Sequence, residues 1–235
     1  MTATPTRNAD AGAATGQLGA AGNPVGSRLE NQAVAASILA FSVLFVTAQV
    51  LHPDPFAGME PMSGAAYLEV FHNHPLVNFA HLLEFFSGAL LIVLASHLYS
   101  LTRLRFPNWA FAALMMATTG AVALIGNKAA ICLTASALDT LTEPQLLAMV
   151  PGLDVIVHRQ GYLAVLWLLP LLPLGFAAFA ILAWLGRAMP RWQAAFLLVG
   201  SLLLANPGVQ ALNTLGAAAL AIALLPYGLN LARSA

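Results

Sequence analysis

Long runs of apolar residues constrain this chain more than any other feature. A helix needs about 20 consecutive apolar residues to cross a hydrocarbon core of about 30 Å, and the sequence contains several such runs. Only 8% of the 235 residues are charged, whereas an ordinary soluble domain carries about 25%. Because so few charges cannot cover a water-facing surface, we expect an all-α, polytopic transmembrane helix bundle in contact with a lipid bilayer.

We expect six spans, or five if the shortest segment does not cross the bilayer. The first four are residues 32–51, 76–98, 109–137 and 162–185. The fourth contains Pro170 and Pro173, which favour kinks. The turn sequence Asn206-Pro207-Gly208 divides the last apolar stretch into a short segment, residues 192–205, and a longer one that ends near residue 232.

The distribution of charge predicts the orientation of these spans. Arginines flank alternate ends of the spans, and basic residues mark the cytoplasmic side of a membrane. The arginines in question are Arg7, Arg28, Arg103, Arg105, Arg187, Arg191 and Arg233. The other connections carry acidic residues, with only Arg159 at a border. We therefore expect both termini in the cytoplasm and a bacterial cytoplasmic (inner) membrane as the location.

The segments outside the spans differ in character. Residues 1–30 are rich in Ala, Gly, Asn and Thr and are expected to form a flexible low-complexity tail, which leaves residues 31–235 as the bundle. In the outer connections, Ser63 is expected to cap a short helix to about residue 71, and Thr142 another to about residue 150. These two helices mix apolar with acidic residues and are expected to roof the outer end of the bundle.

Ionisable residues at membrane depth are costly and usually functional. Glu84 and Lys128 are the two candidates here. With a rise of 1.5 Å per residue, Glu84 lies about 13 Å inward from Pro75 and Lys128 about 28 Å outward from Trp109. The two residues should therefore meet on adjacent antiparallel helices, and we expect an ion pair or a hydrogen bond between them. They are the candidate catalytic residues, and a purely structural ion pair is the alternative.

Histidines also gather at the outer end. The five that do so are His52, His72, His74, His81 and His158, whereas His97 is near the cytoplasmic end. His81 and Glu84 share one helix face with Asn78. Pro75 favours an extended conformation at His74, which would point His72 and His74 to the same side.

This pattern predicts a metal site at His72, His74 and His81, with His81 and His158 as candidate cofactor-binding residues. A transition metal or haem is the expected cofactor, although histidines at a bilayer interface also serve as simple anchors.

Three functional hypotheses remain open at this point. The first is an extracytoplasmic site for redox or small-molecule chemistry, built on the histidines, Glu84 and Lys128. The second is an accessory subunit of a respiratory or photosynthetic membrane complex, supported by the low-complexity tail, the scarce charge and the absence of a complete catalytic signature. Small residues at 216–223 would permit close contact with a neighbouring helix, and the partners considered are other membrane subunits or a second copy of the chain in a homo-oligomer. The third is a proton-coupled transporter that uses Glu84 and Lys128.

The single cysteine, Cys132, excludes an intramolecular disulfide. No phosphate-binding loop, nucleophile elbow or haem-attachment motif is present, and a net charge of zero gives no reason to expect nucleic acid as a partner.

Overall fold

The computed structural model describes residues 28–52, 63–206 and 209–234, and within these ranges all regular structure is helical. The all-α bundle expected from the sequence is therefore confirmed. Most of the expected N-terminal tail lies outside the described residues. Its last three positions, 28–30, form the beginning of α1 (Arg28–Val50).

Five helical stretches of the described residues are long and apolar enough to cross a membrane, as expected for a multi-pass membrane protein. They are α1, α3 (Pro75–Thr102), α4 with η1 and α5 (Pro107–Leu138), η2 with α7 (Gly161–Gly186) and α9 (Gln210–Ser234). A further apolar helix, α8 (Arg191–Leu204), has 14 residues. At 1.5 Å per residue it is about 21 Å long, which is shorter than the hydrocarbon core.

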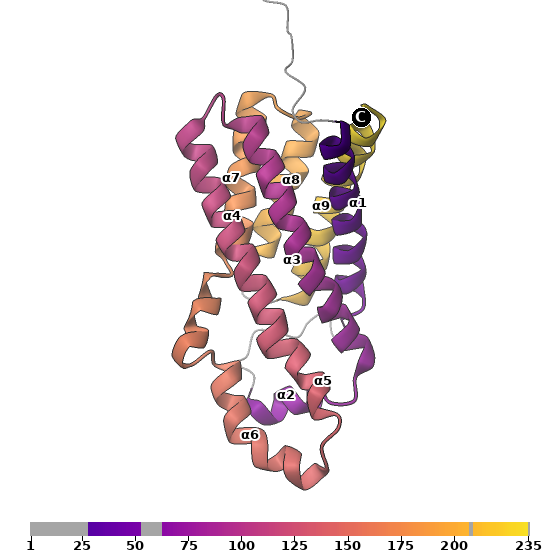
Figure 1. Cartoon of the computed structure of the whole chain (residues 1–235), viewed down its shortest axis with the longest axis vertical. Coiled ribbons are helices and arrows are strands. Elements are labelled where there is room, and N and C mark those ends of the chain that lie inside the picture. Colours follow the sequence, from indigo (N-terminus) through magenta and orange to yellow (C-terminus); the bar gives the residue numbers. More distant parts are fainter. Residues whose placement is uncertain (1–27, 53–62, 207–208, 235) are drawn as a thin grey trace, which may run out of the picture.

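Six helices of the described chain pack into a closed ring. α1, α3, α4, α7, α8 and α9 each contact the next in this order, and α9 returns to contact α1. The short α8 thus counts as one of the six ring helices. Because the number of ring helices is even, α1 begins and α9 ends on the same side of the bundle (Figure 1).

This end is called the inner end below, and the opposite one the outer end. Each described arginine of the expected cytoplasmic set lies at or beside the inner end of a helix. These residues are Arg28, Arg103, Arg105, Arg187, Arg191 and Arg233. Arg7 lies outside the described residues. The described chain thus begins and ends, at Arg28 and Ser234, at the same end of the bundle as these arginines, and the cytoplasmic location of that end stays a prediction.

An apolar core fills the ring between its two ends. Its most deeply buried large residues come from five of the ring helices and are Ile38, Phe41, Leu94, Leu98, Phe179, Leu197 and Leu224. Small residues allow the helices to approach closely. A Cβ atom added to Gly175 would lie 2.4 Å from the backbone nitrogen of Ala117, so α7 can pack against α4 only because Gly175 has no side chain.

The small residues at 216–223 contribute to packing within the chain. A Cβ atom on Gly216 would lie 3.0 Å from the carbonyl oxygen of Gly200 on α8. Ala217 and Leu220 belong to the apolar core. These positions therefore stabilise the contact between α8 and α9, and their contact with a partner subunit stays a prediction.

Two spans lose regular α-helical geometry toward the outer end. The span that begins at Pro107 is α-helical to Asn127 (α4, Pro107–Asn127), continues as a π-helix, η1 (Lys128–Leu133), and ends with α5 (Thr134–Leu138). The span that begins at Gly161 starts as a 3₁₀ helix, η2 (Gly161–Leu168), and becomes α-helical only at α7 (Leu171–Gly186). The break falls at Pro170, as expected from its missing N–H group.

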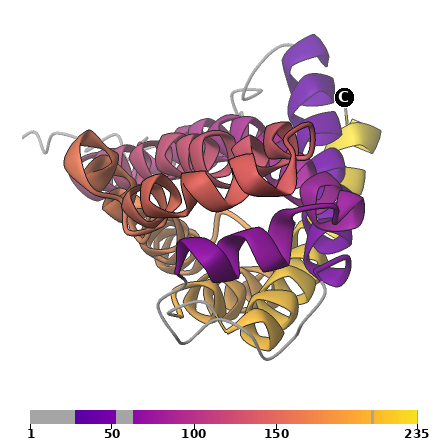
Figure 2. The ribbon, with the colours of Figure 1, turned by 90° about the horizontal axis from the view of Figure 1, so that it is seen from below.

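Two further helices lie across the outer end and form the expected roof (Figure 2). α2 (Gly64–Phe71) is capped by Ser63, whose hydroxyl oxygen accepts a hydrogen bond from Ala66 N at 3.1 Å. α6 (Glu143–Val157) begins with a capping box between Thr142 and Gln145 and runs past its expected end. α2 packs on α6, where Gly64 N donates to Asp154 Oδ1 at 2.5 Å.

Candidate functional site

Glu84 and Lys128 form a buried ion pair at the outer end of the ring. Glu84 lies on α3, and Lys128 is the first residue of the π-helix η1. The Lys128 ammonium contacts Glu84 Oε2, and only 14% and 7% of the two side chains are exposed. The pairing predicted from the depths of the two residues is confirmed. Because each charge neutralises the other, the pair can remain in a region where an isolated charge would be costly.

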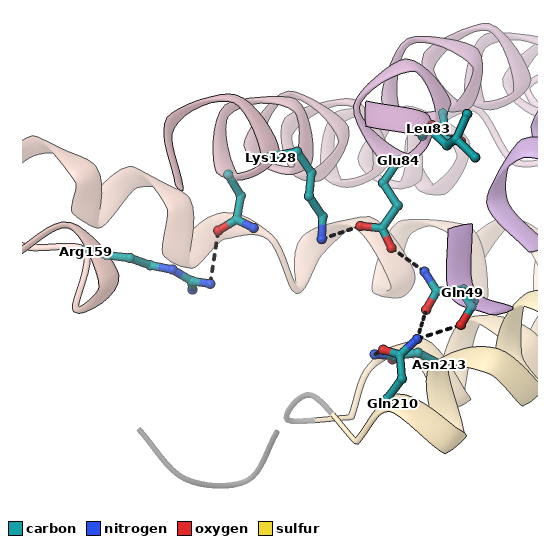
Figure 3. A network of polar contacts seen from close by, with 9 residues as sticks. Gln49, Leu83, Glu84, Lys128, Arg159, Gln210 and Asn213 are labelled. Carbon is teal, nitrogen blue, oxygen red and sulfur yellow. Dashed lines mark hydrogen bonds and ion pairs between the residues drawn. The ribbon is translucent and has the colours of Figure 1, made fainter. Parts of the chain in front are cut away.

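The ion pair continues into a chain of amide side chains, which Figure 3 shows. Gln49 Nε2, on α1, donates to Glu84 Oε1 at 2.5 Å. Gln210 Nε2, on α9, donates to the side-chain oxygen of Gln49 at 2.9 Å and to its backbone oxygen at 3.1 Å. We call Gln49, Glu84, Lys128 and Gln210 the polar layer. It links three ring helices and η1 across the bundle.

Asn213 extends the polar layer along α9. Its Nδ2 donates to Gln210 Oε1 at 3.5 Å, and its Oδ1 accepts from Asn206 Nδ2 at 2.8 Å. The sequence analysis did not identify Gln49, Gln210 or Asn213 as site residues. The available signal was their spacing, because Gln210 and Asn213 are one turn apart on one face of a helix, and Gln49 interrupts an otherwise apolar span.

His81 lies one turn outward of Glu84 on α3. Its side chain is almost completely buried, with 2% exposed, and its ring packs against those of Phe71 and His52, with centroids 5.2 Å and 5.6 Å away. His81 Nδ1 has no hydrogen-bond partner among the described residues. Buried polar atoms in native proteins are nearly always hydrogen-bonded, so an unpartnered nitrogen at this position is unusual.

Asn78 lies one turn further outward on the same helix. Its Nδ2 donates to the carbonyl oxygen of Phe71 at 3.4 Å. Its Oδ1 is buried and, within the described residues, accepts no hydrogen bond. Asn78, His81 and Glu84 therefore form a row of buried polar groups on one face of α3, as their spacing predicted.

The other expected ligands do not join this row. His72 Nδ1 lies 2.9 Å from Asp139 Oδ1, and His72 Nε2 lies 2.8 Å from Asn73 Nδ2. His74 is exposed at the beginning of α3. His158 is at the C-terminus of α6, where its Nδ1 contacts the Asp154 carbonyl oxygen at 2.7 Å.

The loop that carries His72 and His74 is not extended throughout. Asn73, between them, has a left-handed backbone with φ of 57°, which interrupts the extended segment that the sequence predicted. No group of three His, Cys, Asp or Glu side chains suited to a metal occurs in the described parts of the chain. The metal site at His72, His74 and His81, and the cofactor role of His158, remain predictions.

Tyr67 connects the roof to the span that carries Lys128. Its hydroxyl donates a hydrogen bond to the backbone oxygen of Ile131, inside η1. Burial raises the pKa of the Tyr67 phenol above its ordinary value, so the hydroxyl stays protonated as a donor. The contact holds α2 against the π-helix, and π-helical turns often accompany functional sites.

Comparison with known protein families, with curated proteins and with solved structures found no match to this chain.

The chemistry available at the outer end follows from these contacts. Glu84 is a carboxylate that accepts hydrogen bonds from Lys128 and Gln49. His81 offers one free ring nitrogen, which acts as donor or acceptor according to its tautomer. Asn78 offers an amide oxygen. All three are hydrogen-bonding groups that lie beneath the roof of α2 and α6, and Glu84 is in addition paired with Lys128.

Proposed function

We propose that this integral membrane protein binds a small polar molecule from the extracytoplasmic side, at the row of Asn78, His81 and Glu84, and that Glu84 with Lys128 exchanges a proton with it. The observation that carries the proposal is the pair of buried, unpartnered atoms, Asn78 Oδ1 and His81 Nδ1. Leaving a buried polar atom without a hydrogen bond costs about 1–3 kcal/mol. A bound molecule removes this cost and thereby gains affinity.

The two free atoms indicate the class of ligand. An amide oxygen only accepts hydrogen bonds, so the ligand brings an O–H or N–H donor to Asn78. His81 Nδ1 can accept a second donor or give a proton. Phe71 closes one side of the His81 ring. These features favour a small molecule with a hydroxyl or amino group and an apolar part.

The apolar core supports access from the outer side alone. Residues such as Phe41, Leu94 and Phe179 are fully buried inward of the polar layer. A transporter would have to part this core in each cycle. We therefore favour binding or catalysis at the outer end over transport.

Thiol labelling tests access to the site from the outer side. In a Cys132→Ser background, Asn78→Cys and His81→Cys should react with a small membrane-impermeant methanethiosulfonate reagent applied to the outer side of the membrane. Leu94→Cys, which lies about 20 Å further along α3, is the matched control and should not react from either side. Failure of both outer positions to react would overturn the proposal, and reaction of Leu94→Cys from the inner side would favour a transport path.

The content of the purified protein tests binding. Detergent-purified protein, expressed with metals and haem precursor supplied, is examined by optical spectroscopy, metal analysis and mass spectrometry of extracted small molecules. We expect one organic molecule in near-stoichiometric amount, lost in His81→Leu and retained in Ser96→Ala, an exposed control on α3. A metal or haem lost in the same variant would establish the cofactor hypothesis instead. Finding neither class of ligand would overturn both.

A further inference from the structure

A groove on the lipid-facing surface runs between α4 and η2. Its volume is about 390 Å³. The residues that line it are Thr118, Thr119, Val122, Ala123, Gly126, Val165, Leu166 and Leu168. From Thr118 to Gly126 it follows α4 for about 12 Å. Thr118 donates its hydroxyl proton to the Leu114 carbonyl oxygen at 2.7 Å, so its hydroxyl is already hydrogen-bonded within α4.

Arg159 joins the two walls of the groove at its outer end. On the α4 side, one of its terminal nitrogens donates to Asn127 Oδ1 at 3.2 Å (Figure 3), and Asn127 follows the groove residue Gly126. On the η2 side, the guanidinium lies over the ring of Trp167, 4.6 Å from its centroid. Trp167 stands between the groove residues Leu166 and Leu168, and 63% of it is exposed.

The backbone around Arg159 is held in an uncommon conformation. Arg159 has φ of 53°, in the left-handed region that non-glycine residues rarely adopt. The turn formed by Arg159 and Gly161 ends α6 and redirects the chain into η2. It turns the Arg159 side chain back toward α4.

The depth of Arg159 matches the level of lipid headgroups. Asn127 lies about 27 Å along the helix from Trp109, which is 73% exposed at the inner end. A hydrocarbon core is about 30 Å thick. If Trp109 marks the inner interface, Asn127 lies just inside the outer one, and Arg159, which reaches Asn127 from the end of α6, is close to the level of the headgroups.

The charge of Arg159 is not neutralised within the described chain. In residues 28–52, 63–206 and 209–234 no carboxylate lies within ion-pair distance of it, and the two ion pairs there involve other residues. A guanidinium has five N–H donors, and one of them is used by Asn127. The remaining donors match the geometry of a phosphate group.

We propose that the α4–η2 groove and Arg159 form a binding site for one anionic phospholipid of the outer leaflet. One acyl chain occupies the groove, and the phosphate contacts the guanidinium. This inference is independent of the proposed function, because it involves neither His81 nor Glu84. It identifies the lipid that contacts the irregular span next to Lys128.

Fluorescence quenching of Trp167 tests the site. Trp109, Trp184 and Trp192 are replaced by Phe, and the protein is reconstituted into phosphatidylcholine vesicles. Increasing fractions of dibrominated phosphatidylglycerol or dibrominated phosphatidylcholine are then included. A basic residue near an anionic headgroup contributes about 1 kcal/mol, so we expect phosphatidylglycerol to reach half-maximal quenching at about a fivefold lower fraction than phosphatidylcholine.

Three substitutions sharpen this test. Arg159→Gln should abolish the preference, whereas the matched control Arg105→Gln, at the inner end, should retain it. Thr119→Phe, which fills the groove, should weaken quenching by both lipids. Within each variant, the half-maximal fraction for phosphatidylglycerol is divided by that for phosphatidylcholine. This ratio cancels any direct effect of Arg159 on Trp167 emission. Equal quenching by the two lipids in the starting protein, or a preference that survives in Arg159→Gln, would overturn the proposal.

Discussion

The apolar core and the polar layer lie in the same ring of helices but are stabilised differently. In the core, α4 approaches α7, and α8 approaches α9, through glycine and alanine, and buried hydroxyls such as those of Ser42 and Ser201 bond to their own helix. In the polar layer, side chains from different helices bond to one another. Contacts in the core therefore depend mainly on shape, with the 2.7 Å contact of His97 Nε2 with the Tyr227 hydroxyl as an exception, whereas contacts in the layer depend on specific partners.

This difference has a physical reason. Lipid chains are as apolar as leucine, so helices in a bilayer associate through close packing and polar contacts and gain little from the hydrophobic effect. The core associates through close packing, and the polar layer associates through polar contacts. A region whose groups depend on partners can also accept a ligand as a partner, and the unpaired atoms of Asn78 and His81 adjoin the polar layer.

The largest expected effect is that of breaking the ion pair. Lys128→Met leaves Glu84 buried without its cation, and removal of one member of a buried pair typically costs about 3–5 kcal/mol. The double variant Glu84→Gln/Lys128→Met removes both charges and should regain most of this loss. Unfolding in mild detergent, followed by circular dichroism, measures both variants.

Arg103→Met is the control for the loss of a basic side chain. Arg103 is exposed at the inner end, stacked near the ring of Tyr99, and its replacement should change stability little. If Lys128→Met were no more destabilising than Arg103→Met, the polar layer would not depend on its ion pair, and the contrast with the apolar core would fail.

The second effect concerns the apolar core. Gly175→Ala places a Cβ atom against the Ala117 backbone, which cannot move without separating α4 from α7. Overpacking of this kind costs about 1–3 kcal/mol. The same substitution at Gly152, on α6 in the roof, meets nothing within 4 Å and should be neutral or stabilising by up to about 1 kcal/mol. Equal stability of the two variants would show that close packing does not limit the core.

The sequence predicted the spans and the ion pair because each has a strong local signal. Apolar length gave the third span as residues 109–137, and the helical stretch runs over Pro107–Leu138. Glu84 and Lys128 were paired in advance because opposite charges at one depth in lipid have few alternatives. The capping residues Ser63 and Thr142 likewise marked the beginnings of the two roof helices.

The remaining features depend on contacts between distant parts of the chain. The link from Gln49 to Gln210 exists because α9 closes the ring on α1, and nothing in either segment specifies that neighbour. The π-helix at Lys128 receives a hydrogen bond from Tyr67 of the roof, which local sequence does not reveal. The contact between His72 and Asp139, beside the left-handed Asn73, joins the α2–α3 loop to a residue much further along the chain, and local sequence does not specify it.

The smallest expected effect is the loss of the amide hydrogen bonds of the polar layer, whose contribution can be measured separately from that of the ion pair. Gln210→Leu removes two hydrogen bonds to Gln49, and such bonds between membrane helices contribute about 0.6 kcal/mol on average and about 1.7 at most. A double-mutant cycle with Gln49→Leu measures the coupling and cancels the separate loss of the contact from Gln49 to Glu84. Gln193→Leu, near the inner end of α8, combined with Gln210→Leu serves as an uncoupled reference.

A coupling of about 0.6 kcal/mol would show that the amides only complete the hydrogen bonding around the ion pair. A coupling near zero would mean that α9 is held to α1 by packing alone, as in the apolar core, and the polar layer would then end at Gln49.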